Sequence, residues 1–238
     1  MPKPPVPFGY KAVIAVLAPL ACLLTKRTWR GRENFPRQGG FIVAANHISS
    51  FDFLPLVHFL TWLARPPQVL AKQSLFEAPV VGAAMRAMGM IPVSRGTAAA
   101  ARSLDGAAKA LAEGGLVLIY PEGTVTRDPD GWPMRGRPGA VKLALQTGAP
   151  LIPVAQWGAQ RLLPRGRKIP RLFPRTRVSL VAGPALDLAD LMEWEDRDAA
   201  ARVGASRLMA ALSQMVGELR GAKAPAEPYN QFAKEGPK

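Results

Sequence analysis

The chain has 238 residues and a formal net charge of +14. This length suffices to bury the core of one large α/β domain, and the positive charge favours polyanionic partners such as nucleic acid, anionic lipid or phosphorylated substrates. Cys22 is the only cysteine, which excludes an intramolecular disulfide, and the two histidines, His47 and His58, do not form a transition-metal ligand pattern, so no metal is expected.

The first predicted element is an apolar run from Ala12 to Leu24, which basic residues and Trp29 follow. The run is shorter than the ~20 residues that a helix needs to span a bilayer. The basic and aromatic side chains after it favour a helix in the membrane interface, with these side chains at the level of the lipid head groups. A buried core helix is the alternative. We assign residues 1–34 to an N-terminal membrane-associated helical segment.

The next two elements frame the first candidate site. Residues 41–45 form an apolar run typical of a buried strand, and residues 53–63 predict a helix. Pro55 fits the first turn of that helix, where backbone N–H groups have no intrahelical partner. His47 and Asp52 therefore lie where a strand passes into a helix. In open α/β sheets, ligands bind in the crevice outside the carboxyl ends of the strands.

The pair of His47 and Asp52 has two interpretations. A bend before the helix lets the carboxylate reach the imidazole, whereas one continuous helix would turn the side chains about 140° apart. A carboxylate on one ring nitrogen fixes the tautomer and leaves the other nitrogen free as a base. The hydroxyl that this base activates would come from a substrate. In the second interpretation, residues 49–52 only cap the helix and place an acidic residue in its first turn.

The rest of the chain alternates short apolar runs with amphipathic segments. The run at 116–120 is apolar throughout and is expected at the centre of the sheet, whereas Pro153 predicts an edge or a strand end for 151–155. The other expected strands are 68–71, 90–94 and 178–182, and the other expected helices are 78–88, 97–113, 140–146 and 197–220. The predicted fold class is α/β, with a mixed, mostly parallel central sheet flanked by helices. This domain spans residues 35–221, and residues 222–238 are expected to be a mobile tail.

A basic stretch spans Arg161 to Arg177, with seven basic residues and no acidic ones. Leucines, Phe173 and prolines lie among them. Nucleic-acid binding would need a folded motif or a stacking platform, which the sequence does not show, so no nucleic-acid partner is expected. Basic residues interleaved with apolar ones suit an anionic membrane surface better.

Four stretches together carry a resemblance to a family. Their order and spacing, from about Phe41 to Val154, resemble the glycerolipid acyltransferases of the 1-acylglycerol-3-phosphate acyltransferase (PlsC-like) family. The stretches are Asn46-His47-x-Ser49-x-x-Asp52, Gly89-Met90-Ile91-Pro92-Val93-Ser94-Arg95, Tyr120-Pro121-Glu122-Gly123-Thr124 and Leu151-Ile152-Pro153-Val154. One motif alone would be weak evidence, whereas the set is specific.

The resemblance implies transfer of a fatty acyl group from acyl-CoA or acyl carrier protein to a hydroxyl of a lysophospholipid, with no cofactor. His47 matches the general base, Asp52 its orienting carboxylate, and Arg95 the arginine that binds the phosphate of the acceptor. The resemblance further implies a membrane-associated protein at the cytoplasmic face of the cell membrane, and it implies no particular oligomeric state. The other positions matched to substrate binding are Asn46, Ser49, Lys72, Glu122, Gly123, Thr124 and, near the acyl chain, Pro153.

The third motif departs from the usual Phe-Pro-Glu-Gly-Thr-Arg-Ser of the family. Tyr120 replaces the Phe, Val125 stands at the Arg position and Thr126 at the Ser position. Arg127 is a candidate to supply the missing charge at a different reach. We expect lysophosphatidic acid as the acceptor and phosphatidic acid as the product. The open alternatives are another lysolipid, a glycolipid or an ornithine lipid as acceptor, and a non-catalytic module that binds anionic membranes. The absence of a G-x-S-x-G elbow argues against a lipid hydrolase.

Overall fold

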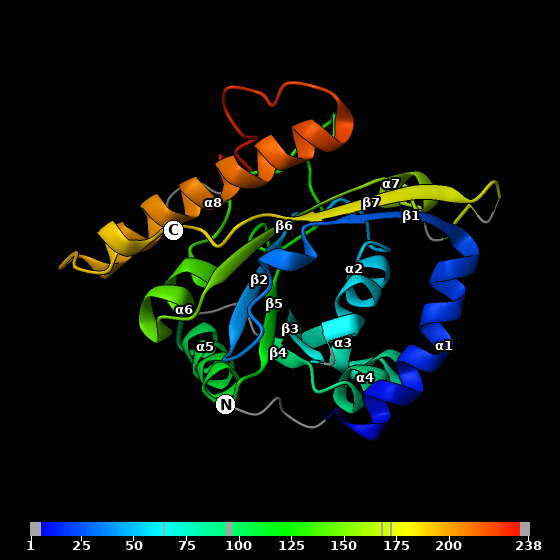
Figure 1. Cartoon of the computed structure of the whole chain (residues 1–238), viewed down its shortest axis with the longest axis horizontal. Coiled ribbons are helices and arrows are strands. Elements are labelled where there is room, and N and C mark those ends of the chain that lie inside the picture. The colour runs from blue at the N-terminus through cyan, green and yellow to red at the C-terminus, as the bar shows by residue number, and fades with distance from the viewer. Residues whose placement is uncertain (1–5, 64, 94–96, 168, 172, 234–238) are drawn as a thin grey trace.

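The computed structural model describes residues 6–63, 65–93, 97–167, 169–171 and 173–233. Within these residues, one sheet of seven strands has the order β1-β7-β6-β2-β5-β3-β4 (Figure 1). Neighbouring strands are parallel except for β6 and β7, which run antiparallel. The predicted fold class is confirmed. The strands are β1 (Thr25–Arg30), β2 (Phe41–Ala45), β3 (Pro67–Lys72), β4 (Ile91–Val93), β5 (Leu116–Ile119), β6 (Leu151–Trp157) and β7 (Thr176–Ala182).

Helices cover both faces of the sheet (Figure 1). One layer is α1 (Phe8–Leu24), α2 (Phe53–Leu60), α3 (Gln73–Glu77) and α4 (Pro79–Ala87), and the other is α5 (Thr97–Ala112), α6 (Gly139–Thr147) and α8 (Arg197–Arg220). The short α7 (Ala159–Leu162) follows β6, and single 3₁₀ turns lie at Arg32–Asn34, Thr61–Leu63 and Ala189–Leu191. Along β2, Phe41 and Val43 pack in the first layer and Ile42 and Ala44 in the second. Because both faces are buried, the strands are apolar throughout rather than alternating.

The positions of β5 and β6 in the sheet test two predictions. β5 lies between β2 and β3, as predicted for the most apolar run. The edge prediction from Pro153 is wrong, because β6 lies between β2 and β7. Pairing with β7 starts only at Val154, and the Pro153 carbonyl accepts a hydrogen bond from the Gly183 N–H at 2.9 Å. Since N and C=O of an extended residue face the same side, the missing N–H of Pro153 faces β7 at the end of this ladder, and Pro153 removes no hydrogen bond to β2.

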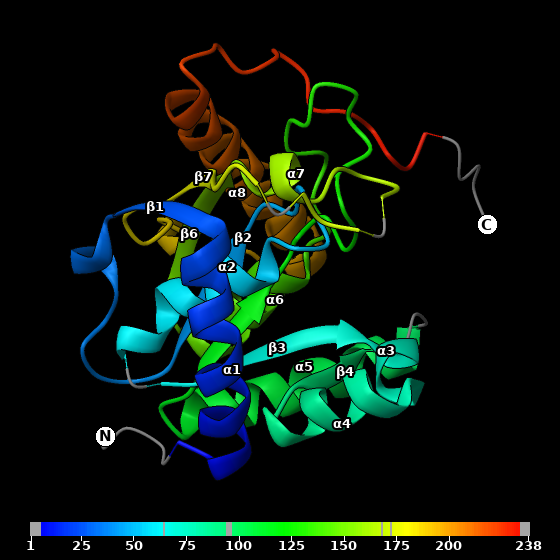
Figure 2. The same cartoon turned by 90° about the vertical axis from the view of Figure 1, so that its right-hand side faces the viewer.

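The N-terminal segment contains the predicted helix, but it also contributes a strand to the sheet. α1 packs against α2 and α4 (Figure 2), but the basic residues after it continue as strand β1, which pairs in parallel with β7. The sheet therefore begins before residue 35, although the sequence predicts that the α/β domain starts at that residue. The side chains of β1 are mostly exposed, so an apolar pattern could not reveal this strand. In the described ranges, no helix has both the length and the hydropathy to cross a bilayer.

Part of the C-terminal tail, which the sequence predicts to be mobile, lies against the domain. α8 ends before Gly221, whose φ of 67° lets the chain turn back. Residues 229–232 then pack against the loop after β5, and the side chain of Gln231 is only 7% exposed. The Gln231 side chain, the Phe232 ring and the Tyr229 carbonyl make the contacts between this part of the tail and the domain.

Candidate active site

The loop of residues 46–52 joins β2 to α2 at the carboxyl edge of the parallel strands. Asn46 and Gln156 fix its start to β6 through three hydrogen bonds. The Asn46 Nδ2 donates to the Gln156 carbonyl at 3.1 Å, the Gln156 N–H donates to Asn46 Oδ1 at 2.8 Å, and the Gln156 Nε2 donates to the Asn46 carbonyl at 2.7 Å. Both side chains are buried, so these bonds hold the loop in one position relative to the sheet.

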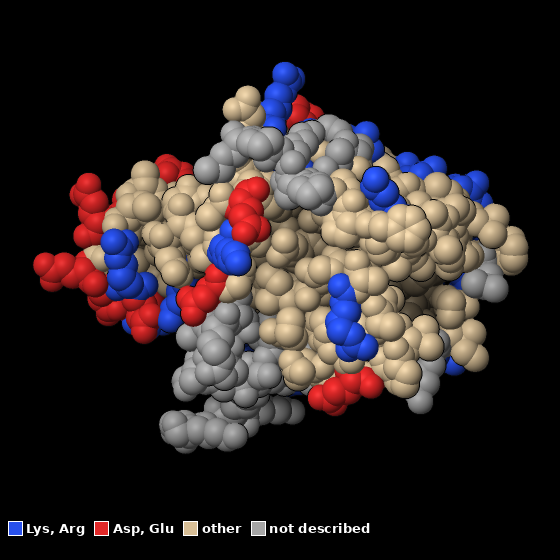
Figure 3. All heavy atoms as spheres, turned by 90° about the horizontal axis from the view of Figure 1, so that it is seen from below, with Lys and Arg blue, Asp and Glu red and all other residues tan. Residues whose placement is uncertain are grey.

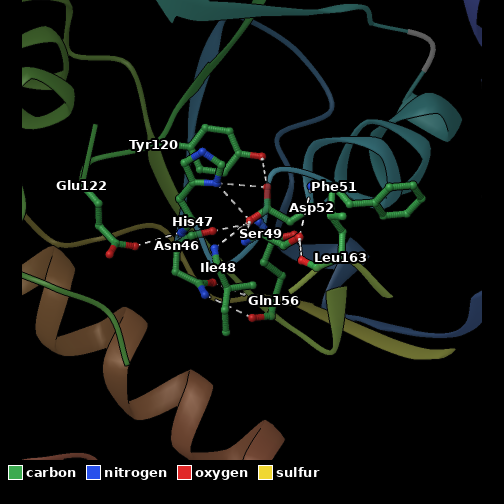
Figure 4. Close-up of polar contacts among 10 residues, drawn as sticks. All are labelled: Asn46, His47, Ile48, Ser49, Phe51, Asp52, Tyr120, Glu122, Gln156 and Leu163. Atoms are coloured by element: carbon green, nitrogen blue, oxygen red, sulfur yellow. Dashed lines mark hydrogen bonds and ion pairs between the residues drawn. The ribbon is translucent and has the colours of Figure 1, made fainter. Parts of the chain in front are cut away.

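The imidazole of His47 faces the carboxylate of Asp52 (Figure 4). The His47 Nδ1 lies 3.1 Å from Oδ1 and 3.0 Å from Oδ2. Oδ2 also accepts hydrogen bonds from the N–H groups of Ile48 at 2.7 Å and Ser49 at 3.0 Å. Asp52 occupies the N-cap position of α2, but its side chain makes no capping bond to the helix. The carboxylate is turned toward the loop and His47, so the cap interpretation does not explain it.

Tyr120, directly after β5, contacts both members of this pair. Its hydroxyl donates to Asp52 Oδ1 at 3.1 Å, and its ring stacks on the His47 imidazole with the centroids 4.2 Å apart. Burial and the charge of Asp52 raise the pKa of Tyr120 well above its ordinary value, so the hydroxyl remains a donor. The imidazole is therefore held by a carboxylate at its edge and by an aromatic ring on its face.

Glu122 supports the backbone around His47. Its Oε1 accepts from the His47 N–H at 2.8 Å, and its Oε2 accepts from the Met134 N–H at 3.0 Å. Burial raises the pKa of Glu122 to about 7, although the two backbone hydrogen bonds act in the opposite direction. On the other side of His47, its carbonyl accepts from the Thr126 N–H at 2.7 Å. The third motif thus holds the His47 backbone from both sides.

The environment of His47 is that of a base. Its side chain is 20% exposed, whereas that of Asp52 is fully buried. Burial by itself lowers the pKa of His47, but the charge and hydrogen bond of Asp52, with a contribution from Glu122, outweigh it and raise the pKa above 6.5. Because Nδ1 faces Asp52, Nε2 is the ring nitrogen that can take a proton from a substrate.

Ser49 holds the middle of the loop. Its hydroxyl donates to the Leu163 carbonyl at 2.7 Å and accepts from the Phe51 N–H at 3.1 Å. Leu163 directly follows α7 and lies within the basic stretch of residues 161–177. Ser49 therefore connects the loop to this stretch.

A small pocket adjoins the loop at Glu122 and has a volume of about 20 Å³. We call it the arginine pocket, because the exposed Arg127 and Arg137 line it. Its guanidinium groups favour an anionic group. The other lining residues are Glu122, Gly123, Thr124, Gln231 and Phe232.

The sequence around this site matches a known protein family. The family model described as Acyltransferase matches residues 26–157, which is more than half of the chain. The chain belongs to this acyltransferase family. The matched region of this acyltransferase includes the loop of residues 46–52, the third motif and Gln156, but not Leu163 or the C-terminal residues of the arginine pocket.

Individual relatives agree with the family. The 1-acyl-sn-glycerol-3-phosphate acyltransferase of Bacillus subtilis is 31% identical over 191 residues, covering 79% of this chain and 85% of that protein. The protein of the same name from Borreliella burgdorferi is 32% identical over 168 residues, which is 69% of this chain but only 63% of that protein. The crystal structure of PlsC, the 1-acyl-sn-glycerophosphate (LPA) acyltransferase from Thermotoga maritima, superposes with a TM-score of 0.66 at 24% identity, covering 91% of this chain and 83% of that one. This superposition shows a shared fold.

The predicted site residues of the acyltransferase fall into three groups. The structure brings Asn46, His47, Asp52 and Glu122 together, with Ser49 in the middle of the same loop. Gly123, Thr124 and Arg127 line the arginine pocket. Lys72 instead ends β3, Pro153 lies within the sheet opposite Ala44, and Arg95 lies outside the described residues, so its role stays a prediction.

Sequence reasoning missed four residues of the site. The motif comparison notes Tyr120 only as a departure and gives it no role. The predicted strand of residues 151–155 ends one residue before Gln156. A polar residue at the carboxyl end of a buried strand is the signal that could have identified Gln156. Arg137 and Gln231 offered no local signal, because only the fold brings them to Glu122.

Proposed function

We propose that this acyltransferase moves a fatty acyl group from acyl-CoA or acyl carrier protein to the free hydroxyl of lysophosphatidic acid, giving phosphatidic acid. The observation that supports the reaction most directly is the contact of His47 Nδ1 with both oxygens of Asp52. It leaves Nε2 as a base for a substrate hydroxyl. The names of the relatives from Bacillus subtilis and Borreliella burgdorferi support the acceptor.

In the proposed reaction, Nε2 of His47 takes the proton of the acceptor hydroxyl while the oxygen bonds to the thioester carbonyl carbon. The tetrahedral intermediate then expels the thiolate of the donor, and the thiolate takes the proton from His47. Because the acceptor attacks the thioester directly, no acyl-enzyme forms. Between the two transfers the imidazole carries a positive charge, which Asp52 and Glu122 stabilise.

The arginine pocket supports a phosphorylated acceptor. The chain carries Val125 where the usual family motif has an arginine, and the two arginines that line the arginine pocket, Arg127 and Arg137, stand at other positions. Guanidinium groups bind phosphate through paired, charge-assisted hydrogen bonds. Val125 is the observation that favours the second candidate acceptor, a lipid with a different head group.

We also propose that the protein acts at a membrane surface. Phe8 on α1 is 86% exposed and Val80 on α4 is 83% exposed. On the side where α1 and α4 lie, the surface seen from below is largely uncharged (Figure 3). The basic stretch also exposes Ile169, and its Arg175 donates hydrogen bonds to backbone carbonyls at the end of α1. Exposed apolar side chains beside arginines suit an anionic membrane interface.

The first test is acyl transfer by the purified protein in anionic liposomes, with labelled acyl-CoA and lysophosphatidic acid. We expect labelled phosphatidic acid from the wild type and a loss of about 10²–10⁴-fold in kcat for His47→Ala, the range of general-base catalysis. His58→Ala is the matched control, because His58 lies on α2 beside Trp29 and outside the site. It should retain transfer.

The outcomes separate the alternatives. Label in another lipid that depends on His47 would keep the chemistry and replace the acceptor. Equal transfer by wild type and His47→Ala would reject the mechanism. No transfer to any lysolipid from either donor would favour a membrane-binding module.

A further inference from the structure

The C-terminal residues beyond α8 form part of the arginine pocket. The Gln231 Nε2 donates to the carbonyl of Glu122 at 3.0 Å and to the carbonyl of Arg135 at 2.9 Å. The Arg135 N–H donates to the Tyr229 carbonyl at 3.0 Å. Residues 229–232, which we call the C-terminal strap, are therefore bonded to both segments that border the pocket, the one after β5 and the one before α6.

The strap also contacts the arginine that sequence reasoning missed. The guanidinium carbon of Arg137 lies 5.0 Å from the ring centroid of Phe232, a cation–π distance. On its other side, Arg137 passes close to Gly123, where an added Cβ would lie 3.3 Å from Arg137 Nε. Gly123 has a φ of +69°, so this turn favours glycine for its backbone and leaves room for the arginine. The Arg137 side chain is thus placed between a turn and an aromatic ring.

The charge of Arg137 is available for a ligand. Among the residues that the structure describes, its guanidinium forms no ion pair with a carboxylate. The nearby Glu122 directs its carboxylate oxygens to the N–H groups of His47 and Met134 instead. Arg127 lines the same pocket, so two positive charges lie beside the residue that supports the His47 backbone.

We propose that the C-terminal strap positions Arg137 to bind the phosphate monoester of the acceptor lipid. The inference rests on the proposed function and extends it, because it assigns the phosphate to Arg137 and Arg127 and makes Gln231 and Phe232 positioning residues. The Phe232 ring restricts the rotamers of Arg137 before the ligand arrives, which lowers the entropy lost on binding. The positive charge of the pocket therefore comes from Arg127 and Arg137, and the strap holds Arg137 in place.

The test separates acceptor binding from chemistry. For lysophosphatidic acid, Arg137→Ala is expected to raise KM at least about 10-fold, since a charge-assisted hydrogen bond is lost. Phe232→Leu is expected to raise KM about 3- to 5-fold, as for a lost cation–π contact, and Phe232→Tyr should restore it. In each variant kcat should stay within about twofold, and turnover of the phosphate-free 1-acylglycerol should not change. Arg202→Ala, on the exposed face of α8, is the matched control and should behave as wild type.

Ligand binding to the His47→Ala protein tests the role of the strap without turnover, so the test remains valid if the proposed acceptor is wrong. Titration calorimetry with lysophosphatidic acid and with 1-acylglycerol, both in neutral detergent micelles, should show a phosphate preference that Phe232→Leu weakens. If the wild type turns over a different lipid but this preference depends on Phe232, the strap stands and the proposed acceptor fails. The strap proposal would be overturned if the phosphate preference is absent or is unaffected by Phe232→Leu. It would also be overturned if the KM of the Arg137→Ala and Phe232→Leu variants rises equally for both acceptors.

Discussion

The loop of residues 46–52 and the arginine pocket lie side by side but are built differently. In the loop, the Asp52 carboxylate is fully buried and faces the His47 ring, the Tyr120 hydroxyl and two backbone N–H groups. In the pocket, Arg127 and Arg137 are exposed. The buried network fixes one geometry, whereas exposed side chains from separate segments can change independently. If the proposed function holds, the chemistry is fixed by the fold, while acceptor choice is carried by a few replaceable side chains.

The largest effect should follow from breaking the buried network at Asp52. Asp52→Asn keeps the shape but removes the charge that orients the imidazole and raises its pKa, so we expect kcat to fall about 10²-fold or more.

The pH profile tests the same pair, because activity needs neutral His47 and therefore rises with pH through the pKa of His47. In the wild type this rise in kcat/KM should be centred above pH 6.5, because the pKa is raised. In the variant burial remains as the main effect, so the rise should move below 6.5. A wild-type midpoint below 6.5 would contradict the assigned environment.

Glu122 allows a test of the same network through stability. Burial raises its pKa from 4.5 to about 7, so the folded state holds a proton that the unfolded state has released. Folding stability should therefore fall as the pH rises from about 5 to 8, by about 3 kcal/mol from this residue. His47, whose pKa is also raised, adds a loss in the same direction above pH 6.5. Urea unfolding at several pH values should show this slope, and Glu122→Gln should flatten it. An equal slope in both proteins would show that Glu122 is not protonated in this range.

The smallest effect should come from the Tyr120 hydroxyl. Tyr120→Phe keeps the ring on His47 and removes one hydrogen bond to Asp52, so kcat should fall less than about fivefold. Without this donor the carboxylate acts more strongly on the imidazole, and the midpoint of the pH profile should move upward. Tyr120→Leu removes the stacking as well and should cost more activity. If the profile of Tyr120→Phe coincides with that of the wild type, the hydroxyl has no part in holding Asp52.

The sequence predicted the buried half of the site better than the exposed half. His47, Asp52 and Glu122 belong to short motifs at strand ends, where neighbours in sequence are also neighbours in space. Phe232 reaches the pocket only because α6, β6 and α8 return the chain to the end of β5. Arg137 reaches it because the loop after β5 folds back, and its N–H donates to the Pro121 carbonyl at 2.8 Å. No local pattern could therefore pair the two residues. The same limit applies to β1, whose place in the sheet depends on backbone pairing with β7 rather than on its side chains.

The antiparallel arrangement of β6 and β7 determines where the N-terminal helix meets the catalytic edge. β6 ends at Trp157, opposite Ser179, and β1 begins at Thr25, opposite Thr176. The end of α1 therefore lies at the same edge of the sheet as the loop that carries His47. If α1 lies in the interface as we propose, a lysolipid can present its hydroxyl to His47 while its tail stays among the lipids. Acyl transfer would then require only sideways diffusion of the lipid, without its extraction into water.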